Sequence, residues 1–151
     1  MIDEKNIKDL IVTQLKNNLT DFKVDDFPFD INNYVPKHVK GEILIKAIGY
    51  RPTQYLDRNN QMNVLTFGNF VVFEYQFRLD FISKLFTKQD ELLEITKTIV
   101  EKMRAIDCAA IIEGAGKFMV IDVGEALYHE QKLFHFRTMV FTLPVMTYLG
   151  D

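Results

Sequence analysis

Two carboxylates and a lysine near the end of the chain form the pattern closest to a catalytic motif. Asp122 is followed by Glu130 and Lys132, a spacing of the form D-x7-E-x-K. On adjacent strands, two carboxylates can hold Mg²⁺ and a lysine can help to position a water, as in metal-dependent nucleases. The pattern is short and degenerate, and a charged strand end followed by a hairpin turn produces it more often. A Mg-dependent nuclease is therefore retained as an alternative function of a different class.

The other chemistry-bearing residues favour structural roles. His129 and His135 lie on either side of Glu130, but their spacing matches no familiar zinc site. Cys108, the only cysteine, lies among small and apolar residues, which is typical of a core position and not of a nucleophilic thiolate. Ser83, the only serine, has Phe, Ile and Leu around it, which disfavours Ser-His-Asp hydrolysis. We therefore assign no catalytic residue, no metal ligand and no cofactor.

Two further patterns have structural explanations. Gly114 and Gly116 lack the third glycine of a phosphate loop, and a strand pattern follows them where such a loop needs a helix. Phe73, Tyr75 and Phe77 alternate along one strand pattern, as the base-stacking aromatics of RNA-binding sheets do. The residues between them supply almost no basic charge, which such sheets need. We expect these rings to lie in the core, and we expect no specific nucleic-acid binding.

The composition predicts one globular domain. The chain has 151 residues, of which 48% are hydrophobic and 26% are charged, and one domain typically has ~100–150 residues. The 13 Phe and 6 Tyr argue against disorder, and the net charge of −3 gives no general attraction for nucleic acid or anionic lipid. No apolar run approaches the ~18–20 residues of a membrane span, and the N-terminus lacks the apolar segment of a signal peptide. We expect a protein of a reducing cytosol with no membrane partner.

Two segments have the periodicity of amphipathic helices. Residues 3–19 begin with Asp3 as a plausible N-cap and carry one apolar stripe. Residues 88–105 follow a capping-box pattern that starts at Thr87, with Asp90 in the place of the usual glutamate. In both segments the charged residues lie off the stripe, which predicts helices that pack one face on a core.

The clearest strand signal runs from Phe70 to Phe81, and from Phe73 onward apolar and polar residues alternate strictly. At ~3.3 Å per residue such a strand is ~40 Å long, about the whole diameter expected for a globule of this size. It must therefore curve, or project beyond its own domain and be covered by a neighbour. Shorter strands are expected around Phe22–Val24, over Glu42–Tyr50 and over residues 117–123, and a long polar connection is expected over residues 51–66.

The last strand pattern, residues 132–145, changes parity along its length. Phe134 occupies one face, whereas Met139 and Phe141 occupy the other. Because side chains alternate along a strand, this predicts either a bulge near residues 137–138 or a strand that is covered on both faces.

The order of these elements predicts the fold class. A helix, two strands, a long strand, a second helix and a closing pair of strands are typical of an α+β domain. We expect a mostly antiparallel sheet of four to five strands with two helices packed on one face and with long β-hairpin arms. Residues 1–151 form a single domain in this interpretation.

Four residues are candidates for an oligomer interface. Tyr55 and Arg58 lie in the polar connection, and both residue types are favoured at interfaces. Phe70 and Val72 lie on the polar side of the long strand, where exposed apolar residues need a partner. A second layer of core beneath the connection explains Phe70 and Val72 equally well.

The expected opening helix contains the sequence Ile7-Lys8-Asp9-Leu10-Ile11-Val12-Thr13-Gln14-Leu15-Lys16. This segment resembles the opening helix of the phage tail terminator and tail-completion family related to the Mu-like Gp37 proteins. The remaining elements follow in the order found in that family, namely the strand Glu42–Tyr50, the long strand Phe70–Phe81, the helix 88–105 and a closing hairpin with Phe134–Leu143. Residues 43–47 depart from the family by lacking its Pro-Ala-Val-Leu-Val-like start.

The resemblance implies a non-enzymatic structural protein of a phage, prophage or phage-like tail. Members of the family assemble as a ring, commonly a homo-hexamer, that caps the tail tube, ends its polymerisation and presents the surface that joins the head or neck. The implied partners are further copies of the chain, the tail tube protein and a neck or head-completion protein. The implied location is the host cytoplasm during assembly and then the particle tail. Another head–tail connector, or an adaptor of a contractile injection system, is the alternative within the same class.

Overall fold

The computed structural model describes residues 3–27, 34, 40–84 and 88–150. The elements in chain order are α1 (Glu4–Asn18), β1 (Lys23–Asp26), β2 (Glu42–Pro52), β3 (Gln54–Leu56), β4 (Met62–Val64), β5 (Thr66–Phe67), β6 (Phe70–Ser83), α2 (Gln89–Ala105), the short 3-10 helix η2 (Cys108–Ala110), β7 (Met119–Val123), β8 (Leu127–His129) and β9 (Phe134–Tyr148).

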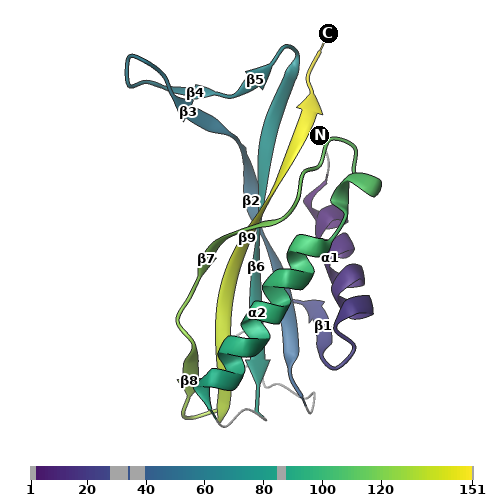
Figure 1. The fold of residues 1–151 in the computed structure, drawn as a ribbon, viewed down its shortest axis with the longest axis vertical. Helices are drawn as coiled ribbons and strands as arrows, with labels where there is room; N and C mark the ends of the chain where they lie inside the picture. The colour runs from purple at the N-terminus through teal and green to yellow at the C-terminus, as the bar shows by residue number, and fades with distance from the viewer. Residues whose placement is uncertain (1–2, 28–33, 35–39, 85–87, 151) are drawn as a thin grey trace.

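One mostly antiparallel sheet organises the chain, with the strand order β1-β2-β6-β9-β7. The pairing of β1 with β2 is parallel, and the other pairings are antiparallel; β5 lies beside β6, and β8 lies beside β9. The strands β3 and β4 form a separate two-stranded hairpin. Figure 1 shows α2 in front of the sheet with α1 beside it, which confirms the α+β prediction.

The pairing of β6 with β9 forms the long axis of the molecule. The register runs without a shift from Phe70 opposite Tyr148 to Ser83 opposite His135. Since β6 has 14 residues, it is about 46 Å long at ~3.3 Å per residue. The predicted long strand is therefore confirmed. Both strands extend past the ends of the helices in Figure 1, so the pair projects beyond the helix layer.

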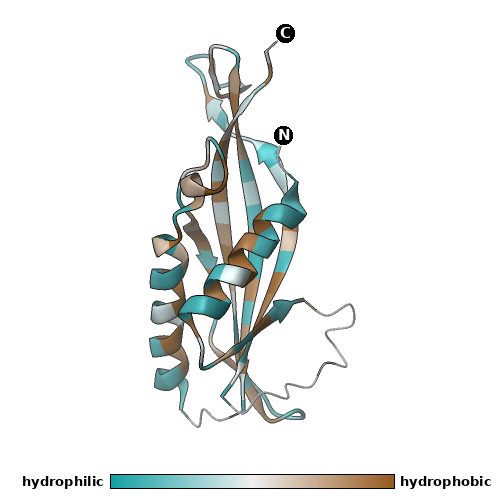
Figure 2. Ribbon diagram, turned by 90° about the vertical axis from the view of Figure 1, so that its right-hand side faces the viewer, coloured by the Kyte–Doolittle hydropathy of each residue, from teal (hydrophilic) through white to brown (hydrophobic). Residues whose placement is uncertain are grey.

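The main core lies between the two helices and one face of the sheet. The helix α1 contributes Ile7, Ile11 and Leu15, and α2 contributes Leu92 and Ile99, all of them fully buried. The sheet supplies alternate residues of its central strands, which are Tyr75, Phe77, Leu79 and Phe81 from β6 and Met139, Phe141 and Leu143 from β9. Figure 2 shows apolar residues recurring along the helices and along the strands of the sheet that they cover. The expectation that the aromatic strand is core is confirmed for Tyr75 and Phe77.

A second, smaller core explains the parity of β9. Phe134 packs with Leu44 and Ile82 on the face of the sheet away from the main core. There is no register shift between β6 and β9, so the predicted bulge near residues 137–138 is wrong and the alternative of coverage on both faces is correct. The register shifts instead in β2, between Ala47 and Gly49, and in β7.

The helix ends follow their capping residues. Asp3 is the N-cap of α1, and its carboxylate accepts a hydrogen bond from the Lys5 amide at 3.0 Å. The helix α2 begins at Gln89 with Lys88 at the N-cap position and no side-chain cap bond. Thr87, the expected start of the capping box, lies outside the described residues, and Asp90 instead lies in the first helical turn, where its charge suits the helix dipole.

We predict that Gly114→Ala lowers the free energy of unfolding by about 1–3 kcal/mol, because a side chain is strained in this conformation and lacks space. Gly114 has φ of +81°, and an added Cβ would lie 2.2 Å from the Met146 carbonyl oxygen. Urea denaturation measures the change. Gly68→Ala is the matched control, since its φ is +61° but nothing lies within 4 Å of the added Cβ, and we expect about 1 kcal/mol there. Equal losses in the two variants would contradict the close approach at Gly114.

Candidate functional site

A β arm projects from one end of the molecule. It comprises residues 50–72, from the end of β2 to the start of β6, and residues 146–149 at the end of β9. Figure 1 shows that neither helix covers this end and that the β3–β4 hairpin leans away from β6 and β9. The prediction of a long polar connection over residues 51–66 is therefore wrong, because much of this segment forms the strands β3, β4 and β5. Backbone hydrogen bonds from Thr53 to Val72 and from Leu65 to Thr53, both 2.8 Å, fix the base of the hairpin.

The outer part of the arm, residues 54–64, is called the tip, and Asp57 organises its turn. The Asp57 carboxylate accepts hydrogen bonds from the Asn59 amide at 2.8 Å, the Gln61 amide at 3.0 Å and the Asn63 side-chain amide at 2.6 Å. These bonds, first of all the one from Gln61, lower the pKa of Asp57. Asn60 adopts φ of +60°, which asparagine tolerates well. The tip is thus a preorganised hairpin, and the Asp57 charge is held inside it.

The tip presents apolar side chains to solvent. Leu56 lies directly opposite Met62, so the two side chains project from the same face of the hairpin. Their exposed fractions are 60% and 57%, and Tyr55 on the other face is 47% exposed. Exposed apolar residues that are clustered in this way are typical of a surface that binds another protein.

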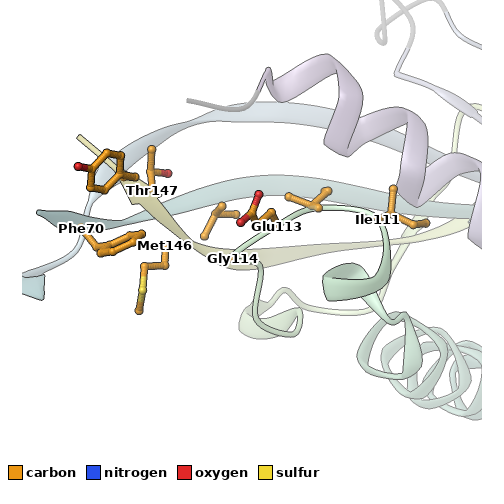
Figure 3. Close-up of a pocket in the computed structure, with 9 residues that line it drawn as sticks. Phe70, Ile111, Glu113, Gly114, Met146 and Thr147 are labelled. Atoms are coloured by element: carbon orange, nitrogen blue, oxygen red, sulfur yellow. The ribbon is translucent and has the colours of Figure 1, made fainter. Parts of the chain in front are cut away.

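A groove with a volume of about 640 Å³ lies where the arm joins the body. It wraps the outer edge of β9 and is lined by Phe70, Ile111, Ile112, Glu113, Gly114, Val145, Met146, Thr147 and Tyr148 (Figure 3). The loop that follows η2 forms one wall, because the Met146 amide donates to the Gly114 carbonyl and the Gly116 amide donates to the Pro144 carbonyl, both at 2.8 Å. Ile111, at 62%, and Tyr148, at 53%, are the most exposed apolar residues of the groove.

The four predicted interface residues all lie on the arm. Tyr55 and Arg58 belong to the tip, and both are exposed. Phe70 is 39% exposed and contacts the ring of Tyr148, with 5.2 Å between the ring centroids; Val72 is half-buried. Phe70 is therefore not in a second layer of core. The role of these residues in an interface stays a prediction.

Sequence reasoning missed most of the groove and the Leu56–Met62 pair. Apolar residues at positions 56, 62 and 64 within an otherwise polar stretch were the available signal for the tip. The groove had no such signal, because residues 111–114 and 145–148 come together only through the backbone bonds between the loop and β9.

The structure does not bring the nuclease candidates together. Asp122 pairs with Val140, whereas Glu130 follows His129, which pairs with Phe134. Those positions are six residues apart on β9, or about 20 Å. Within the described ranges, no three His, Cys, Asp or Glu residues form a group that could hold a metal ion. His129 instead accepts a hydrogen bond from the Lys132 amide at 3.2 Å, within the turn before β9.

A polar pocket of about 200 Å³ lies on the side of the sheet away from the main core. Asp80 is almost fully buried there and bonds to Arg78 at 3.1 Å and to the Thr138 hydroxyl. The Arg78 guanidinium also lies over the Phe27 ring, 5.1 Å from its centroid. Since the carboxylate of Asp80 has both a cationic and a hydroxyl partner, this pocket is explained as a polar connection between neighbouring strands.

Close by, the fully buried Glu42 carboxylate has a hydrogen bond at one oxygen and only an ion-pair contact at the other, which has no hydrogen-bond partner among the described residues. One oxygen accepts a hydrogen bond from the Tyr34 hydroxyl at 2.5 Å, and the other lies 3.6 Å from the Lys23 ammonium. Burial, and then the bond to Glu42, raises the pKa of Tyr34 well above its ordinary value. Tyr34 and Lys23 thus compensate for the cost of burying this carboxylate.

No helix in the described part of the chain has both the length and the apolar character to cross a membrane. Comparisons with protein-family models and with curated proteins find no match to this chain.

We predict that Tyr34→Phe weakens the alkaline loss of stability. Below the ordinary tyrosine pKa of about 10 the phenol is neutral in both the folded and the unfolded chain. Above it, the unfolded chain ionises while folded Tyr34, with its raised pKa, stays neutral, so stability falls as pH rises. Urea denaturation between about pH 9 and 11 should give a flatter profile for Tyr34→Phe than for the wild type. A profile for Tyr34→Phe as steep as that of the wild type would contradict this assignment.

We predict that the thiol of Cys108 reacts slowly in the native protein. Cys108 is buried, and burial together with the Asp107 carboxylate raises its pKa to about 11. Reaction with a chromogenic disulfide at pH 8 should be at least ~100-fold slower in buffer than in urea, because it requires opening of the structure. As this is the only cysteine of the chain, the signal has one source. A native rate close to the rate in urea would contradict a core position.

Proposed function

We propose that this chain is a non-enzymatic structural protein of a phage or phage-like tail. In this proposal it assembles as a ring that caps the tail tube, ends tube polymerisation and presents the surface that joins the head or neck. Its partners are further copies of itself in a homo-hexameric ring, the tail tube protein and a neck or head-completion protein. It acts in the host cytoplasm during assembly and then in the particle tail.

The observation that carries the proposal is the arm, which continues the β6–β9 pairing beyond the helices and exposes apolar side chains. Phe70 and Met146 are about 40% exposed, at 39% and 40%, and Tyr148 is 53% exposed, although all three lie on ordered strands. A long ribbon that exposes apolar residues beyond the helices favours contact with another chain, which would remove those residues from water. The order of elements resembles that of the tail terminator family, and this resemblance is the reason for proposing a ring on a tail tube as the assembly.

A ring also explains why the molecule has two unlike apolar surfaces, the tip and the groove. The tip and the groove are not copies of one patch, so a contact between them is head-to-tail. A head-to-tail contact that closes produces a ring and leaves no free surface for continued growth. This property suits a protein that ends polymerisation.

The test is the assembly of the purified protein, alone and with the tail tube protein. We expect ring-sized particles by light scattering and electron microscopy, and we expect tubes that stop growing when the protein is present. Phe70→Asp should abolish both effects, because a buried unpaired charge at an interface costs several kcal/mol. The matched control is Leu93→Asp on α2, since Leu93 is 41% and Phe70 is 39% exposed. A wild-type chain that stays monomeric at high concentration and leaves tube growth unchanged would overturn the proposal.

A further inference from the structure

We propose that the tip of one copy docks in the groove of the next copy, with Arg58 of the first beside Glu113 of the second. This inference rests on the proposed function and names the surfaces that form the ring.

The first argument is the chemistry of the two surfaces. The Leu56–Met62 pair forms one apolar face of the tip, and both residues are more than half exposed, at 60% and 57%. The groove offers matching apolar walls, with Ile111 62% and Tyr148 53% exposed. Burial of such side chains contributes favourable free energy in proportion to the apolar area removed from water.

The second argument is charge complementarity. At the tip the Asp57 carboxylate is held by three internal hydrogen bonds, so Arg58 is the outward-facing charge of the turn. In the groove the charged lining residue is Glu113, which is also exposed. Among the described residues neither side chain forms an ion pair. A docked tip would give both charges a partner at the edge of the apolar contact.

The third argument is the placement of the two surfaces. Figure 1 shows the β3–β4 hairpin leaning to one side of the sheet, whereas the loop after α2, which forms a wall of the groove, lies on the other side of β9. The tip therefore points away from the groove of its own chain. The two surfaces lie toward the same end of the molecule, so copies arranged side by side place a tip next to a neighbouring groove.

The preorganised turn favours this contact. The hydrogen bonds of Asp57 and the backbone bond from the Asp57 amide to the Gln61 carbonyl, at 2.9 Å, order the tip before it meets a partner. Little conformational entropy is then lost on docking, which improves affinity for a given contact area.

The experiment is a charge reversal with complementation by mixing. Arg58→Glu alone and Glu113→Arg alone each place like charges in every tip–groove contact, and we expect the Kd of self-association to rise roughly 10-fold or more in both. An equimolar mixture of the two variants restores opposite charges in every contact of an alternating ring. We therefore expect the mixture to assemble like the wild type, by sedimentation velocity and on tail tubes. Recovery on mixing excludes misfolding as the cause of the losses.

The control is Glu94→Arg, at an exposed position of α2 outside both surfaces, which should assemble normally. If the wild type assembles and the single reversals assemble equally well, or if mixing restores nothing, the docking proposal is overturned and the proposed function is not. If the wild type forms no ring alone and none on the tube, the proposed function itself fails.

Discussion

The antiparallel pairing of β6 with β9 is the interaction on which the rest of the structure depends. Its register is continuous from Phe70 opposite Tyr148 to Ser83 opposite His135, and every other strand of the main sheet pairs with one of these two strands or with β2, which itself pairs with β6. The pair is about 46 Å long, whereas α1 has 15 and α2 has 17 residues, or about 22 and 26 Å. A layer of helices of that length cannot cover the whole ribbon.

The consequence is a molecule with two different ends. Where the helices lie, β6 and β9 are buried on one face by the main core, and near Phe134 they are buried on both faces. Where the helices stop, the same two strands carry Phe70, Met146 and Tyr148 into solvent. Fully burying one large apolar side chain contributes about 1.5–3 kcal/mol. Contact with another molecule would bury the exposed side chains of the arm and so would be favoured by up to this amount for each of them. The proposed assembly would bury this exposed apolar surface.

Polar groups divide in the same way between the two ends. The buried carboxylates of Asp80 and Glu42 have partners within their own chain, which holds the covered part of the sheet together. On the arm, the Asp57 carboxylate bonds within its own turn, whereas Arg58 at the tip and Glu113 in the wall of the groove are exposed to solvent. Arg58 and Glu113 thus lie beside exposed apolar surface without an ion-pair partner among the described residues.

Much of the fold could be predicted from local patterns. The apolar stripe and the Asp3 cap predict α1, and the strict alternation from Phe73 to Phe81 predicts β6, because helical and strand periodicities are properties of neighbouring residues. The parity change at Phe134 was harder, since a bulge and burial on both faces produce the same local pattern. Only the packing of Leu44 and Ile82 against Phe134 distinguishes them.

By itself, the sequence determined the two α-helices, the longer strands, the α+β class and the excess length of the central strand. Tertiary structure alone decided which residues of the arm share a surface. Leu56 and Met62 become neighbours because the Asp57 turn sets the hairpin register, and Glu113 joins Tyr148 because backbone bonds hold the η2 loop against β9. The periodicity of apolar residues shows which face of one segment is buried, but not which other segments lie beside it. The groove depends on contacts between segments distant in sequence, whose backbone hydrogen bonds can form with almost any side chains.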